Sequence, residues 1–180
     1  MALKATIFKA MINIADMDRD YYTDLNLTIA QHPSETNKRM MVRLVAYILN
    51  AADGLEFTKG LCEDNEPEVW QKNYSGDIEL WIDIGRPEDK RLKSACHKAK
   101  QVLLYTYGDN AQSEWWKLYS QKVLPLSNLS IFHISDEHLL AAEALVSRTM
   151  KIQASIQDGQ LWLSTDTLSV LIEPIRIKCN

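Results

Sequence analysis

The sequence predicts an α/β (α+β) domain in which a mixed β-sheet is flanked by helices. Two runs, at residues 4–15 and 20–31, alternate apolar and polar residues as strands do. Apolar residues then recur at helical spacing between residues 34 and 52. Asp158-Gly159 separates two more alternating runs, which is a strong hairpin signal. Paired strands separated by helices indicate a mixed sheet, and 180 residues are expected to form one domain, 1–180.

Composition and charge argue against several classes of protein. The chain is 46% hydrophobic and 24% charged, as globular domains are. Its net charge of −4 argues against a dedicated duplex-DNA binder, although a small basic patch is compatible with it. Cys62, Cys96 and Cys179 are too few and too widely spaced for a disulfide framework or structural zinc. With no long apolar run and no signal-peptide core, the protein is expected to be cytoplasmic, with no membrane partner.

The first part of the chain is expected to form a hairpin followed by a helix. The polar link at residues 16–20 joins the two strands. Pro33 and Ser34 stand where the helix would start, and Asp53-Gly54 would end it, so we predict a helix at about 34–52. The expected buried faces consist of Phe8, Ala10, Ile12 and Ile14, then Tyr21, Leu25, Leu27 and Ile29, then Met40, Met41, Leu44, Val45, Ile48 and Leu49.

The rest of the chain alternates between helices and strands. Pro87 would open a helix at about 87–100, ahead of a buried strand at 101–107. A helix carrying Trp115 and Trp116 precedes a strand at 129–134. A helix at 136–149 would bury Leu139, Leu140, Ala144 and Leu145. Pro174 suggests that the last strand lies at a sheet edge or carries a bulge.

Residues 66–85 have the pattern of a hairpin with an acidic end. From Asp77 the alternation is strict, with an apolar face and a polar face that includes Trp81. Ser75-Gly76 stands where a two-residue loop would be. If that loop pairs Tyr74 with Asp77, then the pairs that follow on the polar face are Lys72 with Glu79, Trp70 with Trp81, and Glu68 with Asp83.

In this register Glu68 and Asp83 would face each other with Cβ atoms about 5 Å apart. Opposed like charges destabilise a sheet unless a cation lies between them or one carboxyl stays protonated. Two convergent carboxylates suit Mg²⁺, which keeps waters for chemistry. The alternative is that Glu68 lies in an acidic loop and Asp83 in solvent, as a loop longer by one residue would allow.

Three stretches of the sequence resemble the YaeQ family, and the similarity extends over the whole chain. They are HPSETNKRMMVRL at 32–44, EPEVW at 66–70 and GDIELWIDIGRPEDKR at 76–91. The resemblance implies a bacterial protein with a variant of the PD-(D/E)XK restriction-endonuclease-like fold. It assigns Glu35 as the helix acid of that fold, Pro67-Glu68 as its Pro-Asp and Asp83-Ile84-Gly85 as its acid-x-lysine.

The lysine of that motif is absent, because position 85 is glycine. Such a lysine would position the attacking water and stabilise charge in the transition state. Lys90, Lys93 and Lys98 on the following helix are the candidates to replace it.

Two groups of charged residues allow two interpretations each. Glu35, Arg39 and Arg43 share a helix stripe, where Glu35 is either the third acid or part of a solvated face. The two arginines of that stripe could hold phosphate or form a structural ion pair. The helix after Asp83 is either a solvated charged surface or a phosphate contact. Its basic residues are Arg86, Lys90, Arg91, Lys93, Lys98 and Lys100.

Two functions therefore stay open. The first is an Mg²⁺-dependent, nuclease-like phosphodiesterase acting through Glu68 and Asp83, with Glu35 and a displaced lysine. The second is a catalytically inactive relative that binds a nucleic acid or a protein partner through the same polar cleft. The opposed carboxylates favour the first, whereas the acidic pI of about 5.6 and Gly85 favour the second.

Overall fold

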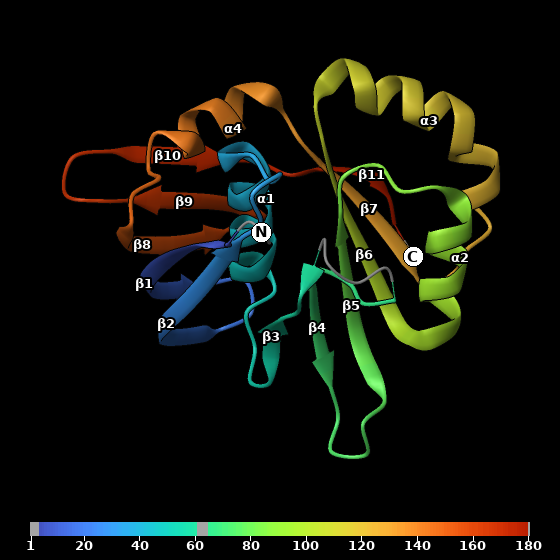
Figure 1. Cartoon of the computed structure of the whole chain (residues 1–180), viewed down its shortest axis with the longest axis horizontal. Coiled ribbons are helices and arrows are strands. Elements are labelled where there is room, and N and C mark those ends of the chain that lie inside the picture. The colour runs from blue at the N-terminus through green and yellow to red at the C-terminus, as the bar shows by residue number, and fades with distance from the viewer. Residues whose placement is uncertain (1–3, 61–64, 180) are drawn as a thin grey trace. The chain divides into compact units, whose positions relative to one another are not determined.

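The computed structural model describes residues 4–60 and 65–179. The chain divides into two compact units: unit 1 is Met1–Leu49 with Glu137–Pro174, and unit 2 is Asn50–Asp136 with Ile175–Asn180. Each unit contains one mixed sheet, so the fold has two sheets where the sequence indicated one. Figure 1 labels the elements. They are β1 (Thr6–Asp16), β2 (Tyr21–Gln31), α1 (Asn37–Leu49), β3 (Leu55–Phe57), β4 (Val69–Lys72), β5 (Ile78–Ile84), α2 (Asp89–Lys98), β6 (Ala99–Tyr107), α3 (Asp109–Val123), β7 (Leu129–Ile134), α4 (Asp136–Glu143), β8 (Thr149–Gln157), β9 (Gln160–Ser164), β10 (Ser169–Ile172) and β11 (Ile175–Lys178).

The sheet of unit 1 has the order β10-β9-β8-β1-β2. The predicted hairpin is confirmed, since β1 and β2 pair antiparallel with Phe8 opposite Ile29. β8 pairs parallel to β1 on its other side. The predicted apolar face of β1 is buried, because alternate side chains of a strand point to opposite faces.

Helix α1 is shorter than predicted at both ends. Its first turn is capped by Thr36 rather than begun at Ser34, because the Thr36 hydroxyl accepts a hydrogen bond from the Arg39 amide at 3.2 Å. Every residue from Met40 to Ile48 is buried, so the helix is buried all round rather than along one apolar stripe.

The predicted helix at 136–149 was too long. α4 ends at Glu143, and β8 begins at Thr149. Leu140 was wrongly placed in the core, since it is 70% exposed, whereas Leu139 is buried as expected. The Asp158-Gly159 hairpin is confirmed: Gln157 pairs with Gln160 across it, and both loop residues have positive φ.

The sheet of unit 2 has the order β11-β7-β6-β5-β4-β3. β5, β6 and β7 are parallel, and α2 and α3 connect them and lie beside them (Figure 1). β11 is an edge strand with a register shift between Arg176 and Lys178, as Pro174 suggested. Helices and sheet share one apolar cluster, made of Trp81, Leu92, Ala95, Ala99, Val102, Leu104, Trp115, Val123, Leu129 and Ile131.

The structure bears on two further sequence expectations, one on membrane-spanning helices and one on the cysteines. No helix among the described residues is long and apolar enough to cross a membrane. Cys96 and Cys179 are free thiols. Cys62 and the acidic residues Glu63 and Asp64 lie outside the described residues.

Candidate functional site

The β4–β5 hairpin reaches the predicted register through two deviations that cancel. Its loop is one residue longer than predicted, because the Asn73 amide donates to the Asp77 carbonyl at 3.0 Å and Gly76 has a φ of +88°. Lys72 therefore pairs with Ile78, and its predicted pairing with Glu79 is wrong. A register shift after that pair restores the predicted alignment, so Trp70 lies opposite Trp81.

Glu68 and Asp83 lie where this restored register ends. The ladder closes with Val69 opposite Ile82, and Glu68 is the residue before β4. The Glu68 amide donates to the Ile82 carbonyl at 3.0 Å, which keeps the chain beside β5. Both acidic side chains are buried, so the alternative of a solvated Asp83 is wrong.

Asp83 is held by Arg91 of α2. The guanidinium donates through Nε to Oδ2 at 3.0 Å and through Nη2 to Oδ1 at 2.8 Å. Nη2 also donates to the Glu66 carbonyl at 2.8 Å. This two-point contact compensates the charge of a carboxylate that is only 2% exposed. Arg91 is one of the basic residues predicted after Asp83, but its pairing with Asp83 was not predicted. A signal was available, since an arginine in the first turn of a helix after an acidic strand end can reach back to that strand.

The arrangement around Asp83 does not fit a magnesium ion as it stands. Mg²⁺ binds carboxylate oxygens directly, and both oxygens of Asp83 accept hydrogen bonds from Arg91. Among the described residues, no group of three or more His, Cys, Asp or Glu side chains is placed to hold a metal. An ion at Asp83 would have to share the carboxylate with the guanidinium or displace it.

Glu68 is enclosed by the loop before β4. A Cβ atom at Gly60 would lie 2.6 Å from Glu68 Oε2, so a larger residue would push this carboxylate aside, and the φ of +53° favours glycine as well. Thr58 fixes this loop, since its hydroxyl donates to the Pro67 carbonyl and accepts from the Gly60 amide. The approach of the backbone explains why a carboxylate at this position is buried.

Gly85 has a backbone that disfavours the missing lysine. Its φ is +98°, a region that side chains other than glycine rarely adopt, although nothing would crowd a Cβ atom there. The Gly85 amide donates to the Tyr105 carbonyl of β6 at 2.9 Å. The glycine therefore serves the turn that leaves β5, and any cationic partner for the acidic residues has to come from another element.

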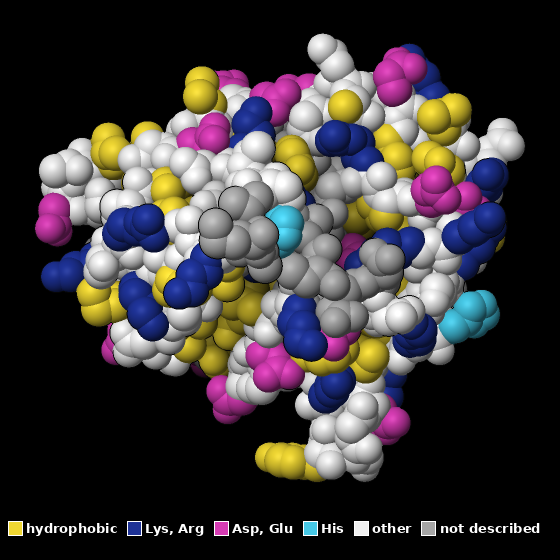
Figure 2. Space-filling model, in the orientation of Figure 1, with side chains coloured by type: hydrophobic (Ala, Val, Ile, Leu, Met, Phe, Trp, Pro, Cys, Tyr) yellow, Lys and Arg dark blue, Asp and Glu magenta, His cyan; other side chains and the backbone are white. Residues whose placement is uncertain are grey.

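Two of the three candidate lysines line a cavity along α2. The cavity has a volume of about 370 Å³ and is formed by Asn65, Trp81, Pro87, Glu88, Lys90, Arg91, Ser94 and Lys98. Lys90, Ser94 and Lys98 recur at four-residue spacing, so they share one face of the helix. Lysine and arginine side chains gather over α2 in the space-filling view (Figure 2). Lys93 instead donates to Asp89 at 2.8 Å, outside this lining.

Trp81 forms the inner wall of this cavity. Its ring is 2% exposed and belongs to the apolar cluster of unit 2, with Lys98 Nζ 5.7 Å from the ring centroid. Its indole Nε1 is buried without an acceptor in the described part of the chain. A buried donor without an acceptor carries a desolvation cost.

Glu35 does not lie on the first helix as predicted, because α1 begins two residues later. Its carboxylate is buried and accepts hydrogen bonds from Arg39 Nη1 and Arg43 Nη2, each at 2.8 Å. The solvated-face interpretation is therefore wrong, and the structural ion pair is confirmed. Glu35 belongs to unit 1, whereas Glu68 and Asp83 belong to unit 2.

Two further carboxylates on unit 2 are tuned by lysines. A hydrogen bond from Lys100 lowers the pKa of Glu79, and one from Lys93 lowers the pKa of Asp89. Burial raises the pKa of Cys96 to about 11. Lys93 of α2 and Lys100 of β6 are thus already paired with carboxylates, so this region has fewer available cations than its sequence suggests.

Comparison with known proteins agrees with the resemblance seen in the sequence. The model of the YaeQ protein family matches residues 1–174. The chain belongs to the YaeQ family. It is 49% identical to the uncharacterized protein YaeQ of Escherichia coli K12 over 166 residues, 92% of each chain. It is 46% identical to that of Salmonella typhi over 164 residues, 91% of each.

Crystal structures of two YaeQ proteins share this fold. The protein from Xanthomonas axonopodis pv. citri superposes with a TM-score of 0.94 at 40% identity, covering 98% of this chain and 99% of its own. The protein from Pseudomonas syringae gives 0.91 at 28% identity, covering 98% and 97%. The α+β architecture described above is therefore that of the YaeQ family.

Proposed function

We propose that this YaeQ-family protein binds a phosphate-bearing single-stranded nucleic acid in the α2 cavity and does not cleave it. The observation that carries the proposal is the contact between Arg91 and both oxygens of Asp83. It occupies the carboxylate that a metal-dependent nuclease of the predicted fold would need for its ion. The same helix presents cationic side chains to a cavity large enough for a small ligand.

The lining of the cavity supports a nucleic acid over a protein partner. Lys90 and Lys98 outnumber the one acidic residue of the lining, Glu88, and lysines of this kind contact phosphate. The Trp81 indole offers a buried donor at the wall. The net charge of −4 limits this attraction to a local patch, so we expect weak binding with a Kd of about 10⁻⁵ M at low salt.

Fluorescence polarisation with a fluorescein-labelled oligothymidylate of twelve nucleotides tests the proposal. The double variant Lys90→Gln/Lys98→Gln is expected to bind about tenfold more weakly at low salt. Its salt dependence should also be shallower, by about 1.4 in the slope of log K against log salt, because two phosphate contacts are lost.

A matched control separates the cavity from overall charge. Lys93→Gln/Lys117→Gln changes the net charge equally, but these lysines pair with Asp89 and Glu114 and lie outside the lining. It should bind within about twofold of the natural chain. Equal losses in the two double variants would contradict a role for the cavity.

The second candidate is the Mg²⁺-dependent phosphodiesterase, which the burial of two carboxylates, Glu68 and Asp83, at the same end of the β4–β5 hairpin favours. Thermal melting in 10 mM MgCl₂ distinguishes the two. An ion with a Kd of about 1 mM would add about 1.4 kcal/mol of stability, or about 3–5 °C. We expect no such rise in the natural chain and a rise in Arg91→Gln, where the carboxylates are no longer held by the guanidinium. A rise in the natural chain that Asp83→Asn removes, together with Mg²⁺-dependent cleavage of the oligonucleotide, would establish the phosphodiesterase instead.

A further inference from the structure

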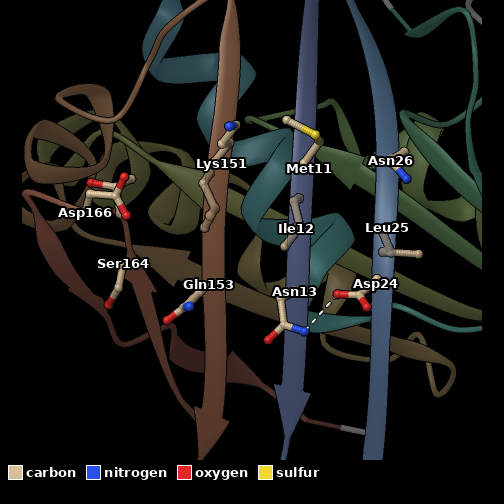
Figure 3. Close-up of a pocket in the computed structure, with 12 residues that line it drawn as sticks. Met11, Ile12, Asn13, Asp24, Leu25, Asn26, Lys151, Gln153, Ser164 and Asp166 are labelled. Carbon is tan, nitrogen blue, oxygen red and sulfur yellow. Dashed lines mark hydrogen bonds between the residues drawn. The ribbon is translucent and has the colours of Figure 1, made fainter.

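A second hollow lies on the exposed face of the sheet of unit 1, separate from the residues of the proposed function. Its volume is about 480 Å³, within the range of sites for small ligands. Side chains of β8, β1 and β2 form its floor, and the start of the β9–β10 loop forms one side (Figure 3). The lining is Met11, Ile12, Asn13, Asp24, Leu25, Asn26, Lys151, Ile152, Gln153, Ser164, Thr165 and Asp166.

The strand register aligns polar side chains in a row across this face. Asn13 of β1 pairs with Asp24 of β2 on one side and with Gln153 of β8 on the other. Gln153 in turn pairs with Ser164 of β9. Because paired residues point to the same face of a sheet, the four side chains form a continuous line. We call this line the polar row.

The ends of the polar row are held by contacts within unit 1. Asn13 Nδ2 donates to Asp24 Oδ1 at 2.8 Å. At the other end, the Ser164 hydroxyl lies 3.0 Å from the Ser169 hydroxyl, and the next residue, Thr165, accepts a hydrogen bond from the Leu168 amide at 3.1 Å, which fixes the turn that carries Asp166. The site is thus built on strands and a closed turn.

Other polar groups of the hollow are available to a ligand. The side chains of Asn26, Lys151, Gln153 and Asp166 make no hydrogen bond with any described residue. Two amides among them each offer a donor and an acceptor, the ammonium offers donors and the carboxylate acceptors. A ligand here would meet alternating donors and acceptors at close spacing.

Charge on this face favours a neutral ligand. Lys9 and Lys151 balance Asp24 and Asp166, so no net field attracts a polyanion such as a nucleic acid. An aromatic side chain adjoins the row. Trp162 precedes Ser164 by two residues, so it lies on the same face of β9, and it is 42% exposed. Met11 supplies a second apolar contact inside the hollow.

We propose that this hollow binds a neutral saccharide. Every sugar hydroxyl is both donor and acceptor, which matches the amides of Asn26 and Gln153 and the carboxylate of Asp166. The apolar face of a pyranose ring would lie on Trp162. The site uses only residues of unit 1, so this proposal is independent of nucleic-acid binding by α2 in unit 2.

A chemical-shift titration of the ¹⁵N-labelled full chain tests the proposal, with maltotriose, cellotriose and N,N′-diacetylchitobiose each added to 20 mM. At least one sugar should shift the Trp162 indole and Gln153 side-chain signals saturably. Gln153→Ala should weaken its Kd about fivefold, as expected for one lost hydrogen bond. Gln157→Ala is the matched control, since it removes an exposed glutamine of the same strand that lies outside the lining. It should change Kd by less than about twofold.

Three results would overturn the proposal: no saturable shift with any of the three sugars, shifts confined to other residues, or equal weakening by the two glutamine variants. Tighter binding of oligothymidylate than of any sugar on the Trp162 face would overturn it as well. Gln153 is exposed, so its removal leaves the core intact, and the dispersion of the amide spectrum verifies that each variant is folded.

Discussion

Replacing Arg91 is expected to destabilise this protein more than replacing Asp83, although the two residues form one ion pair. The Asp83 side chain is 3% exposed, whereas that of Arg91 is 30% exposed. Arg91→Gln leaves a buried carboxylate without its cation, and breaking such a buried pair costs about 3–5 kcal/mol. Water can reach the vacated position through the exposed side of Arg91, so we expect about 2–3 kcal/mol. Asp83→Asn keeps an acceptor and leaves a guanidinium that water can reach, so about 1 kcal/mol is expected.

Urea unfolding of the natural chain, the two single variants and the double variant measures these values and their coupling. For a chain of this length, 2–3 kcal/mol corresponds to a fall in Tm of about 5–10 °C. The double variant should be less destabilised than the sum of the singles, because both removals break the same contact. A smaller loss for Arg91→Gln than for Asp83→Asn, or strict additivity, would refute the description of Arg91 as the counter-ion of Asp83.

Three further outcomes follow from the described contacts. Glu35→Gln should lower the free energy of unfolding by about 3 kcal/mol in urea titrations, because it removes the buried carboxylate that neutralises two guanidinium groups; a loss below about 1 kcal/mol would contradict this. Asp89→Asn should lower Tm at pH 7, and the difference from the natural chain should shrink in acid: the hydrogen bond from Lys93 lowers the Asp89 pKa from 3.8, so its stabilisation is present above that value and is lost as pH falls through the folded pKa. Iodoacetamide at pH 8 should label exposed Cys179 well before Cys96, whose pKa of about 11 keeps it protonated; peptide mass mapping with equal rates would be inconsistent with its burial.

The β4–β5 hairpin marks how far the candidate site could be predicted. Alternation placed Trp70 opposite Trp81 correctly, even though the loop is one residue longer than Ser75-Gly76 suggested. The compensating register shift near Glu79 leaves no trace in the pattern of apolar residues, because it moves one partly buried side chain only. The position of Arg91 in the first turn of α2 allows it to reach back to β5, but Lys90 is in that turn as well, and only the structure shows which of the two contacts Asp83.

Local order accounts for what the amino-acid sequence determined alone: the β1–β2 and β8–β9 hairpins, the strand at 129–134, and the burial of Ile12 and Ile14 all follow from alternation and turn chemistry between near neighbours. Tertiary structure alone decided that there are two sheets and that the Asp83 carboxylate is bound by the Arg91 guanidinium. It also aligned Asn13, Gln153 and Ser164 across one face. Each of these depends on contacts between residues far apart in the chain, whose register is set by packing rather than by the identity of adjacent residues.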